Sequence, residues 1–282
     1  MTAGTAATAA TAATAATTAA AADAASPFDS LAPSYDEAFS RTPLGLRLRA
    51  AVWRHLDRAF PPGSRVLELG CGTGEDALHL ASRGVSVLAT DASAPMVEET
   101  RRKATGAGLE PRIGTSVLSF DGLPASAPSL GGPFDGAFSN FGAVNCAGDL
   151  GSLGRTLAGL LRPGAPLLLV VMGPLVPWEW AWGLLHGRGR QAFRRLAPGG
   201  VPWRGVTVRY PSPRALGAAL SPAFAPGPVS AVGALLPPTE AGEWLARHPA
   251  LLDRLDRWGA RVEGRFPFPW LSDHYLAEFV RP

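Results

Sequence analysis

Short apolar runs alternate with amphipathic stretches along most of the chain. The apolar runs end in Gly, Pro or polar residues and have the length of buried strands. Between them, apolar positions recur at helical spacing over about ten residues. This alternation predicts right-handed βαβ units, and therefore a parallel sheet covered by helices. We predict strands over 65–69, 85–90, 111–115, 134–139, 166–172, 224–232 and 274–280, and helices over 75–82, 93–104, 149–161 and 212–220.

Two segments do not follow this alternation. Residues 1–26 are almost entirely Ala and Thr, with no stripe of large apolar side chains to bury, so we expect a disordered tail. The run 167–185 is long enough to span a bilayer, but Pro174, Pro177 and Glu179 interrupt it. It is better explained as a buried strand followed by an aromatic loop or helix. We therefore expect one domain over 27–282 and no transmembrane segment.

Composition narrows the class of protein. The 282 residues are 46% hydrophobic and 17% charged, which provides a sizeable core and argues against a disordered chain. The net charge is only +3, from 26 basic and 23 acidic residues, so charge gives little support for nucleic-acid binding. Two cysteines, Cys71 and Cys146, form neither a disulfide framework nor a zinc site, and we expect a cytoplasmic protein.

The turn after the first predicted strand carries the clearest chemical signal. Its glycines at positions 70, 72 and 74 allow a tight turn and a close approach of a ligand to the backbone. A dinucleotide fingerprint would place its third glycine one residue later, where Glu75 stands. Glu75 and Asp76 in the first helical turn would repel a diphosphate, so a cationic ligand fits the loop better.

A second acidic residue completes this pattern. Asp91 ends the second predicted strand, about 20 residues after the loop, where a carboxylate can accept hydrogen bonds from both hydroxyls of a ribose. A ligand with a ribose, a positive charge and no diphosphate matches S-adenosyl-L-methionine. We predict this molecule as the cofactor.

Four segments resemble class I S-adenosylmethionine-dependent methyltransferases. Residues 66–104 (VLELGCGTGEDALHLASRGVSVLATDASAPMVEETRRKA) resemble the first two motifs of that family. Residues 28–39 resemble the segment preceding the fold in the small-molecule group that includes ubiquinone/menaquinone-biosynthesis methyltransferases, and 132–140 and 160–170 resemble the region of the fourth and fifth strands. The resemblance implies an α/β, Rossmann-like three-layer sandwich. Its seven-stranded, mostly parallel sheet would have an antiparallel last strand, with lid insertions.

The resemblance also assigns residues to the cofactor. The glycine loop would hold the methionine moiety, Asp91 the ribose, and the residues after it the adenine. Ser116 stands where the family commonly has an Asp that bonds the adenine amine, and Tyr35 matches an aromatic that closes over the cofactor. The implied cofactor-binding residues are Tyr35, Glu68, Gly70, Cys71, Gly72, Thr73, Gly74, Asp91, Ala92, Met96, Ser116, Val117, Asn140 and Phe141.

The acceptor should lie outside the carboxyl ends of the strands, where ligands of open α/β sheets bind. Three long irregular segments, 27–62, 173–205 and 233–271, are expected there as lids. All eight tryptophans fall in them. This favours either an apolar, aromatic-lined pocket or small cores internal to the lids. On the first interpretation we expect a hydrophobic small-molecule acceptor.

Methyl transfer from a sulfonium requires alignment and exclusion of water, so a general base is optional. His274, next to Asp273 at the start of the last predicted strand, and His186, after the tryptophan run, are the candidate catalytic residues. A lone histidine is more often structural. No paired acidic cluster suggests a metal site, and we expect no metal.

Two alternatives remain beside a methyltransferase acting on O or C of a small molecule (EC 2.1.1.-). A nucleic-acid methyltransferase is disfavoured because residues 139–142 are Ser-Asn-Phe-Gly, whereas amino-methylating members hold a flipped base with Asn/Asp-Pro-Pro-Tyr. It keeps some support from arginines that could meet phosphate, at positions 188, 190, 194 and 195. A non-catalytic S-adenosylmethionine-binding protein is less favoured, because the glycines and Asp91 are intact.

Overall fold

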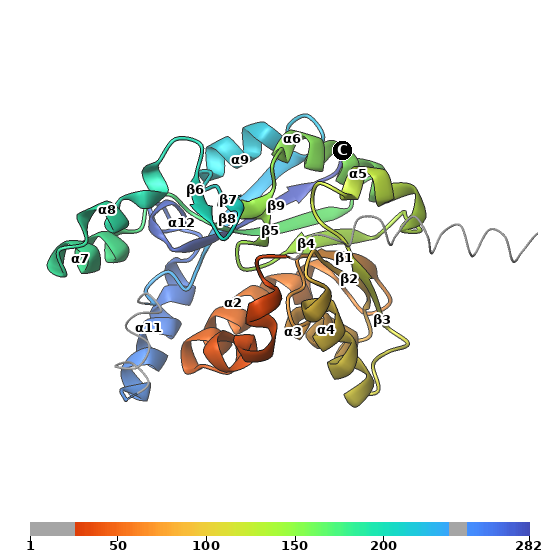
Figure 1. Cartoon of the computed structure of the whole chain (residues 1–282), viewed down its shortest axis with the longest axis horizontal. Helices are drawn as coiled ribbons and strands as arrows, with labels where there is room; N and C mark the ends of the chain where they lie inside the picture. The colour runs from red at the N-terminus through yellow and green to blue at the C-terminus, as the bar shows by residue number, and fades with distance from the viewer. Residues whose placement is uncertain (1–25, 237–246) are drawn as a thin grey trace, which may run out of the picture.

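A seven-stranded sheet forms the centre of the computed structural model, which describes residues 26–236 and 247–282 (Figure 1). The strand order is β3-β2-β1-β4-β5-β9-β8, and β9 runs antiparallel to its neighbours while the other strands share one direction. The predicted α/β, Rossmann-like sheet with its antiparallel last strand is confirmed. The strands are β1 (Arg65–Leu69), β2 (Ser86–Asp91), β3 (Ile113–Val117), β4 (Gly136–Ser139), β5 (Pro166–Met172), β8 (Ala225–Val232) and β9 (His274–Val280).

Helices cover both faces of this sheet and give three layers (Figure 1). Side chains alternate along β5, so Leu168 and Val170 join the core on one face while Leu167 and Leu169 join the core on the other. Each fully buried leucine contributes about 1.5–3 kcal/mol to folding through removal of its apolar surface from water. The first core includes α2 (Pro43–Ala59), α3 (Glu75–Ser82) and part of α4 (Ala94–Gly106); the second includes α6 (Leu150–Leu160) and α9 (Pro213–Leu220).

Local sequence explains where the main helices begin. In each case a short polar side chain precedes the helix and accepts a hydrogen bond from a backbone N–H in its first turn, which is worth about 1 kcal/mol. Proline follows the capping residue closely in three of the four, where its missing N–H costs nothing. The capping residues are Thr42 for α2, Ser93 for α4, Asp149 for α6 and Ser212 for α9.

The segment between β5 and α9 holds structure that the apolar pattern did not predict. It forms a two-stranded antiparallel hairpin from β6 (Val201–Trp203) and β7 (Val206–Val208). Before the hairpin come α7 (Pro177–Leu185), α8 (Gly189–Ala192) and the 3-10 turn η5 (Arg194–Leu196). No helix in the described ranges is long and apolar enough to cross a bilayer.

The remaining elements are short or peripheral. The helix α11 (Pro249–Val262) packs beside α2, with ion pairs Arg47–Asp253 and Arg54–Glu263 between them. The predicted tail, apart from Ser26, and Trp244 lie outside the described residues. The other elements are η1 (Asp29–Ser34), η2 (Asp36–Ser40), α5 (Leu123–Ser126), η3 (Ala127–Ser129), η4 (Ala143–Cys146) and α12 (Phe268–Leu271).

Candidate functional site

A cavity of about 500 Å³ opens at the carboxyl ends of β1, β2, β4 and β5. Such a volume suits a nucleoside cofactor together with part of an acceptor. Residues 26–35 and the β6–β7 hairpin cover it. Its wall is formed by Ser26, Pro27, Phe28, Tyr35, Arg49, Leu69, Gly70, Cys71, Gly72, Asp76, Thr90, Asp91, Ala92, Met96, Leu118, Ser119, Phe120, Asp121, Asn140, Phe141, Gly142, Ala143, Cys146, Met172, Arg194, Val201, Trp203, Val206, Val208 and Tyr210.

The glycine loop forms one wall of this cavity, and its backbone explains the need for glycine. Gly70 has φ 73°, and a Cβ there would lie 2.3 Å from the Cβ of Ala143. Gly72 has φ 53°, and no atom lies within 4 Å of where its Cβ would be. The first glycine therefore permits close packing, and the second exposes backbone to a ligand in the cavity.

Asp91 ties the ends of the first two strands together at the cavity wall. Its Oδ2 accepts a hydrogen bond from the Gly72 N–H at 2.9 Å, and its Oδ1 accepts one from the Ser93 N–H at 2.9 Å. Each carboxylate oxygen can accept a further bond, which leaves room for two ligand hydroxyls. Burial raises the pKa of Asp91 despite these bonds. The geometry fits the predicted ribose contact.

Glu68 lies behind the loop and does not line the cavity. Its side chain is buried, and neither carboxylate oxygen has a hydrogen-bond partner among the described residues. Burial, reinforced by the negative charge of Asp76, raises the pKa of Glu68 well above its usual range. An unpartnered buried carboxylate favours a cation nearby, so the residues present fit a sulfonium cofactor.

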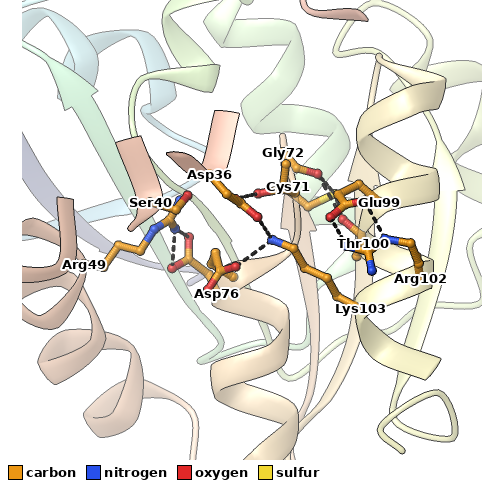
Figure 2. A network of polar contacts seen from close by, with 12 residues as sticks. Asp36, Ser40, Arg49, Cys71, Gly72, Asp76, Glu99, Thr100, Arg102 and Lys103 are labelled. Atoms are coloured by element: carbon orange, nitrogen blue, oxygen red, sulfur yellow. Dashed lines mark hydrogen bonds and ion pairs between the residues drawn. The ribbon is translucent and has the colours of Figure 1, made fainter. Parts of the chain in front are cut away.

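An unpredicted cation lies at the same end of the cavity. Arg49 of α2 places its Nη1 3.0 Å from both carboxylate oxygens of Asp76 (Figure 2). Asn140 donates to Asp76 Oδ2 at 2.8 Å. Trp53 donates to the same carboxylate at 2.7 Å. Asp76 is thus neutralised, and Glu75 is paired with Lys103 at 2.6 Å. The two acids that seemed to repel a diphosphate are both paired, so the preference for a cation is now based on Glu68 and Asp91.

Polar contacts outside the cavity connect the segment η2 to the glycine loop. Asp36 accepts a hydrogen bond from the Thr73 hydroxyl at 2.6 Å and forms an ion pair with Lys103 (Figure 2). Burial would raise the pKa of Asp36, but hydrogen bonds from Lys103 and Thr73 outweigh it and hold that pKa low. Thr73 therefore holds the covering segment, and the neighbouring Tyr35 lines the cavity. Gly74 is the residue from which α3 begins.

The prediction for the adenine side needs a correction. Ser116 and Val117 belong to β3, where they pair with Thr90 and Asp91, and neither lines the cavity. The cavity wall is formed instead by residues 118–121, directly after that strand. The strand was predicted over 111–115 but runs over Ile113–Val117, so the chain reaches the cavity two residues later than expected.

The two candidate histidines lie in different surroundings. His274 donates from Nδ1 to Asp273 Oδ2 at 2.9 Å, and its ring meets Phe141 edge-to-face at 5.8 Å between centroids. It pairs across the sheet with Met172, so it sits behind two cavity residues rather than on the wall. His186 is exposed, with Nδ1 2.8 Å from the Trp182 carbonyl oxygen. This removes the geometric basis for a catalytic His186.

The lid predictions also need correction. Trp203 is the only described tryptophan on the cavity wall, while Trp178, Trp182 and Trp258 are exposed. Within 27–62, α2 is a layer helix of the core rather than a lid. The described parts of 233–271 contribute nothing to the wall. Aromatic lining comes instead from Phe28, Tyr35, Phe120, Phe141, Trp203 and Tyr210.

A buried charged network supports the wall near β9. Arg195 is 2.6 Å from Glu179 and 2.5 Å from Asp273, and its guanidinium lies 5.1 Å from the centre of the Tyr210 ring. Burial would raise the pKa of Asp273, but His274 and Arg195 together hold it well below its usual range. Arg194 pairs with the same Glu179 at 2.9 Å. The sequence showed these arginines only as a basic cluster, because their acidic partners lie far along the chain.

No group of three His, Cys, Asp or Glu side chains within 26–236 and 247–282 is arranged to hold a metal ion. Cys71 and Cys146 both line the cavity and both are free thiols. Burial raises the pKa of Cys71 well above its usual range and that of Cys146 to a smaller extent, so both thiols are protonated at neutral pH.

Comparison with known proteins agrees with this geometry. A family model described as "Methyltransferase domain" matches residues 66–164. A demethylmenaquinone methyltransferase of Thermus thermophilus is 35% identical over 176 residues, covering 61% of this chain and 73% of that protein. An S-adenosyl-L-methionine-dependent Diels-Alderase of Talaromyces variabilis is 39% identical over 116 residues, 40% of this chain and 37% of that protein. The structure of the CcbJ methyltransferase from Streptomyces caelestis superposes with a TM-score of 0.58 at 19% identity, covering 91% of this chain and 98% of that one.

The sheet order and the glycine loop define a Rossmann-like α/β protein whose nucleoside ligand lies at the carboxyl ends of its strands. The cofactor of this class is S-adenosyl-L-methionine. The similarity to the Thermus enzyme shows the family: the chain belongs to the S-adenosylmethionine-dependent methyltransferase family.

Proposed function

We propose that the chain transfers a methyl group from S-adenosyl-L-methionine to an oxygen or carbon of a hydrophobic small molecule. One observation carries the proposal: a single cavity is lined both by the carboxyl groups of Asp91 and Asp76 and by the apolar side chains of Phe141, Met172 and Trp203. A cofactor and an apolar acceptor can therefore meet in one cavity. The demethylmenaquinone methyltransferase similarity supports an acceptor of this kind.

We propose the following roles for the cofactor site. Asp91 holds the two ribose hydroxyls, and the exposed backbone at Gly70 and Gly72 receives the methionine moiety. Arg49 and Asn140, both fixed by Asp76, offer a cation and an amide to the amino-acid end. Tyr35 closes over this end. The corrected adenine contacts come from Ala92, Met96 and residues 118–121.

When bound, the cofactor supplies a methyl group already activated by a positively charged sulfur. The protein must then align the acceptor and exclude water. Phe141 and Met172 line the cavity next to the loop, and the β6–β7 hairpin forms a further part of the wall. Burial raises the pKa of the Tyr210 phenol, so at neutral pH it donates a hydrogen bond rather than removing a proton. Arg194 also lies on the wall, where Glu179 pairs with its guanidinium.

His274 has a positioning role in this proposal. Asp273 fixes its ring, and the ring supports Phe141 from behind. His274→Gln should therefore change the rate through the placement of Phe141 while leaving cofactor affinity unchanged. A log rate that rises with pH through a single ionisation in the protein and flattens in His274→Gln would instead identify His274 as the base.

The test is transfer of label from methyl-labelled cofactor to an organic-soluble acceptor. Demethylated quinols and lipid extracts are the first acceptors to supply. We expect labelled lipophilic product together with an equal amount of S-adenosylhomocysteine. Binding of the cofactor without formation of S-adenosylhomocysteine in any mixture would contradict methyl transfer.

A second function deserves the same assay, because one relative is named an S-adenosyl-L-methionine-dependent Diels-Alderase. On that alternative the cofactor is held but not consumed. Turnover of a substrate without formation of S-adenosylhomocysteine would favour it. Nucleic-acid methylation loses support, because Arg194 and Arg195 are both engaged by Glu179.

A further inference from the structure

The segment from Pro177 to Leu196, here called the apolar platform, presents large apolar side chains to solvent. Leu185 is 82% exposed, and Trp178 and Leu184 are each 56% exposed. The only residue that α7 buries fully is Gly183, which packs against Ala192 of α8, and Trp180 is half-buried against Phe193. The other large residues of the helix, Trp178, Trp182, Leu184 and Leu185, are exposed. In Figure 1, α7 and α8 extend beyond one end of the sheet.

The platform carries more positive than negative charge. Its only acidic residue is Glu179, which is paired with Arg194 at 2.9 Å and with Arg195 at 2.6 Å. Arg188 and Arg190 are exposed and form no ion pair with another described residue. The exposed residues of the platform therefore combine tryptophan and leucine with two arginines that pair with no carboxylate in the described part of the chain.

We propose that the apolar platform docks on an anionic lipid surface. Tryptophan and leucine insert at the boundary between head groups and acyl chains, while arginines pair with lipid phosphates. The helices are too short to cross the bilayer, so they lie in its surface. Arg194 and Val201 belong to the cavity wall, so docking brings the cavity beside the membrane.

Other occupants fit this surface less well. In a symmetric dimer built on the platform, Arg188 and Arg190 of both copies would meet with no exposed carboxylate to pair them. A nucleic acid would neutralise the arginines but leave Trp178 and Leu185 in contact with water or phosphate. A lipid surface satisfies the charges and the apolar side chains together.

Flotation of the full chain with vesicles tests the proposal. The vesicles are phosphatidylcholine alone, or phosphatidylcholine with phosphatidylglycerol at about one third. We expect binding to the anionic vesicles, a blue shift of tryptophan emission, and weaker binding in high salt because salt screens the arginines.

Substitutions localise the contact. Leu185→Glu should weaken partition into the vesicles by about tenfold or more. It removes a leucine that the lipid would bury and adds a negative charge facing anionic head groups. Arg190→Glu should weaken it by about tenfold at low salt and less at high salt. The matched controls are Leu46→Glu, at an exposed apolar residue of α2, and Arg214→Glu, at an exposed arginine of α9. Both controls should partition like the original chain.

The outcomes separate the proposals. Calorimetry with S-adenosylhomocysteine should give the same affinity for all four variants, because none touches the cavity. Equal flotation of Leu185→Glu and Leu46→Glu would overturn the docking surface, as would absence of binding to every vesicle. A dimer in solution that Leu185→Glu dissociates, or a salt-sensitive gel shift with DNA or RNA that Arg190→Glu abolishes, would replace the lipid by a second copy or a nucleic acid. Failure of the docking test would leave the proposed methyl transfer unaffected.

Discussion

At the residue scale, the most informative side chain is Glu68. Its buried carboxyl group has no hydrogen-bond partner among the described residues, and burial raises its pKa well above the usual range. A carboxyl with a raised pKa in the folded state adds stability that is present below its unfolded pKa and lost as the pH rises through its folded pKa. Near neutral pH it therefore costs stability in the protein without ligand.

Glu68→Gln should separate stability from binding. We expect the melting temperature of the protein without ligand to rise at neutral pH, because a neutral amide replaces a buried acid of similar shape. Affinity for S-adenosylmethionine should fall severalfold, because Gln cannot ionise in response to the binding of a cation next to the loop. Thermal melts and calorimetry check the two effects. A variant with a lower melting temperature and unchanged affinity would make Glu68 a structural residue only.

At the element scale, two contacts hold helices and strands around the cavity. One connects η2 to the glycine loop and to α4 through Asp36, Thr73 and Lys103. The other lies on the far side of the core, where His55 of α2 is 3.0 Å from Glu278 of β9 and 3.6 Å from Glu263 after α11. Each contact gives a separate prediction.

Asp36→Asn should loosen the covering segment. It removes the charge that attracts Lys103 while keeping a group that can accept from Thr73. We expect trypsin to cleave faster after the exposed Arg41, and cofactor affinity to fall by about tenfold, the loss that accompanies one charged hydrogen bond. The matched control is Glu37→Gln, an exposed acid on the same turn. Equal cleavage rates in the two variants would contradict this connection of η2 to the glycine loop.

The His55 contact predicts a pH dependence of stability. Burial lowers the pKa of His55, but the hydrogen bonds with Glu263 and Glu278 outweigh it, so the pKa rises above 6.5. The stability it contributes is complete below pH 6.5 and lost as the pH rises through the raised folded value. Between pH 6 and pH 9, the melting temperature of His55→Gln should therefore fall by less than that of the original chain.

Scanning fluorimetry of the two proteins across that range measures the difference. His186→Gln, at an exposed histidine with no carboxylate partner, is the control and should follow the original chain. Parallel curves for His55→Gln and the original chain would show that this contact contributes no titrating stability.

Element prediction from the sequence succeeded where periodicity is strong. The ranges predicted for β1, α3, β5 and β9 match the structure, because each is a continuous apolar run or a clear helical stripe. The β6–β7 hairpin was missed because its strands have only three residues each. Its turn places Arg204 and Gly205 at φ 46° and 88°, and an arginine there gives no turn signal.

Sequence reasoning placed on the cavity wall residues that share one local motif, and it missed residues that only the fold brings together. Gly70, Gly72 and Asp91 lie on the cavity wall, whereas Gly74 precedes α3. Arg49 comes from a helix 27 residues away from its partner Asp76, and no pattern within α2 marks it. The position of β3 shifted by two residues, which was enough to displace the contacts predicted at Ser116 and Val117.

At the scale of the whole molecule, we propose that residues 27–282 form one cooperative domain. The two cores lie on opposite faces of a single sheet, and the cavity draws its wall from both halves of the chain. Calorimetric unfolding should show one transition, and a chain beginning at residue 27 should melt at the same temperature as the full one. Two resolved transitions would contradict a single domain.

Ligand binding should shift that transition as a unit. S-adenosylhomocysteine at about 100 times its dissociation constant stabilises the folded state by about 2.7 kcal/mol, which for a chain of this size raises the melting temperature by roughly 5 °C or more. NAD at the same concentration should give no shift, because the acidic groups of Glu68 and Asp91 next to the loop disfavour a diphosphate.

Calorimetric titration of S-adenosylhomocysteine into the original chain, Asp91→Ala and Ser116→Ala tests the cofactor site most directly. The account predicts that Asp91→Ala weakens binding by about 1.5–3 kcal/mol, or roughly ten- to hundredfold, through the loss of charged hydrogen bonds to the ribose. Ser116→Ala, outside the cavity, should bind like the original chain. Unchanged affinity in Asp91→Ala would contradict the placement of the cofactor at this loop.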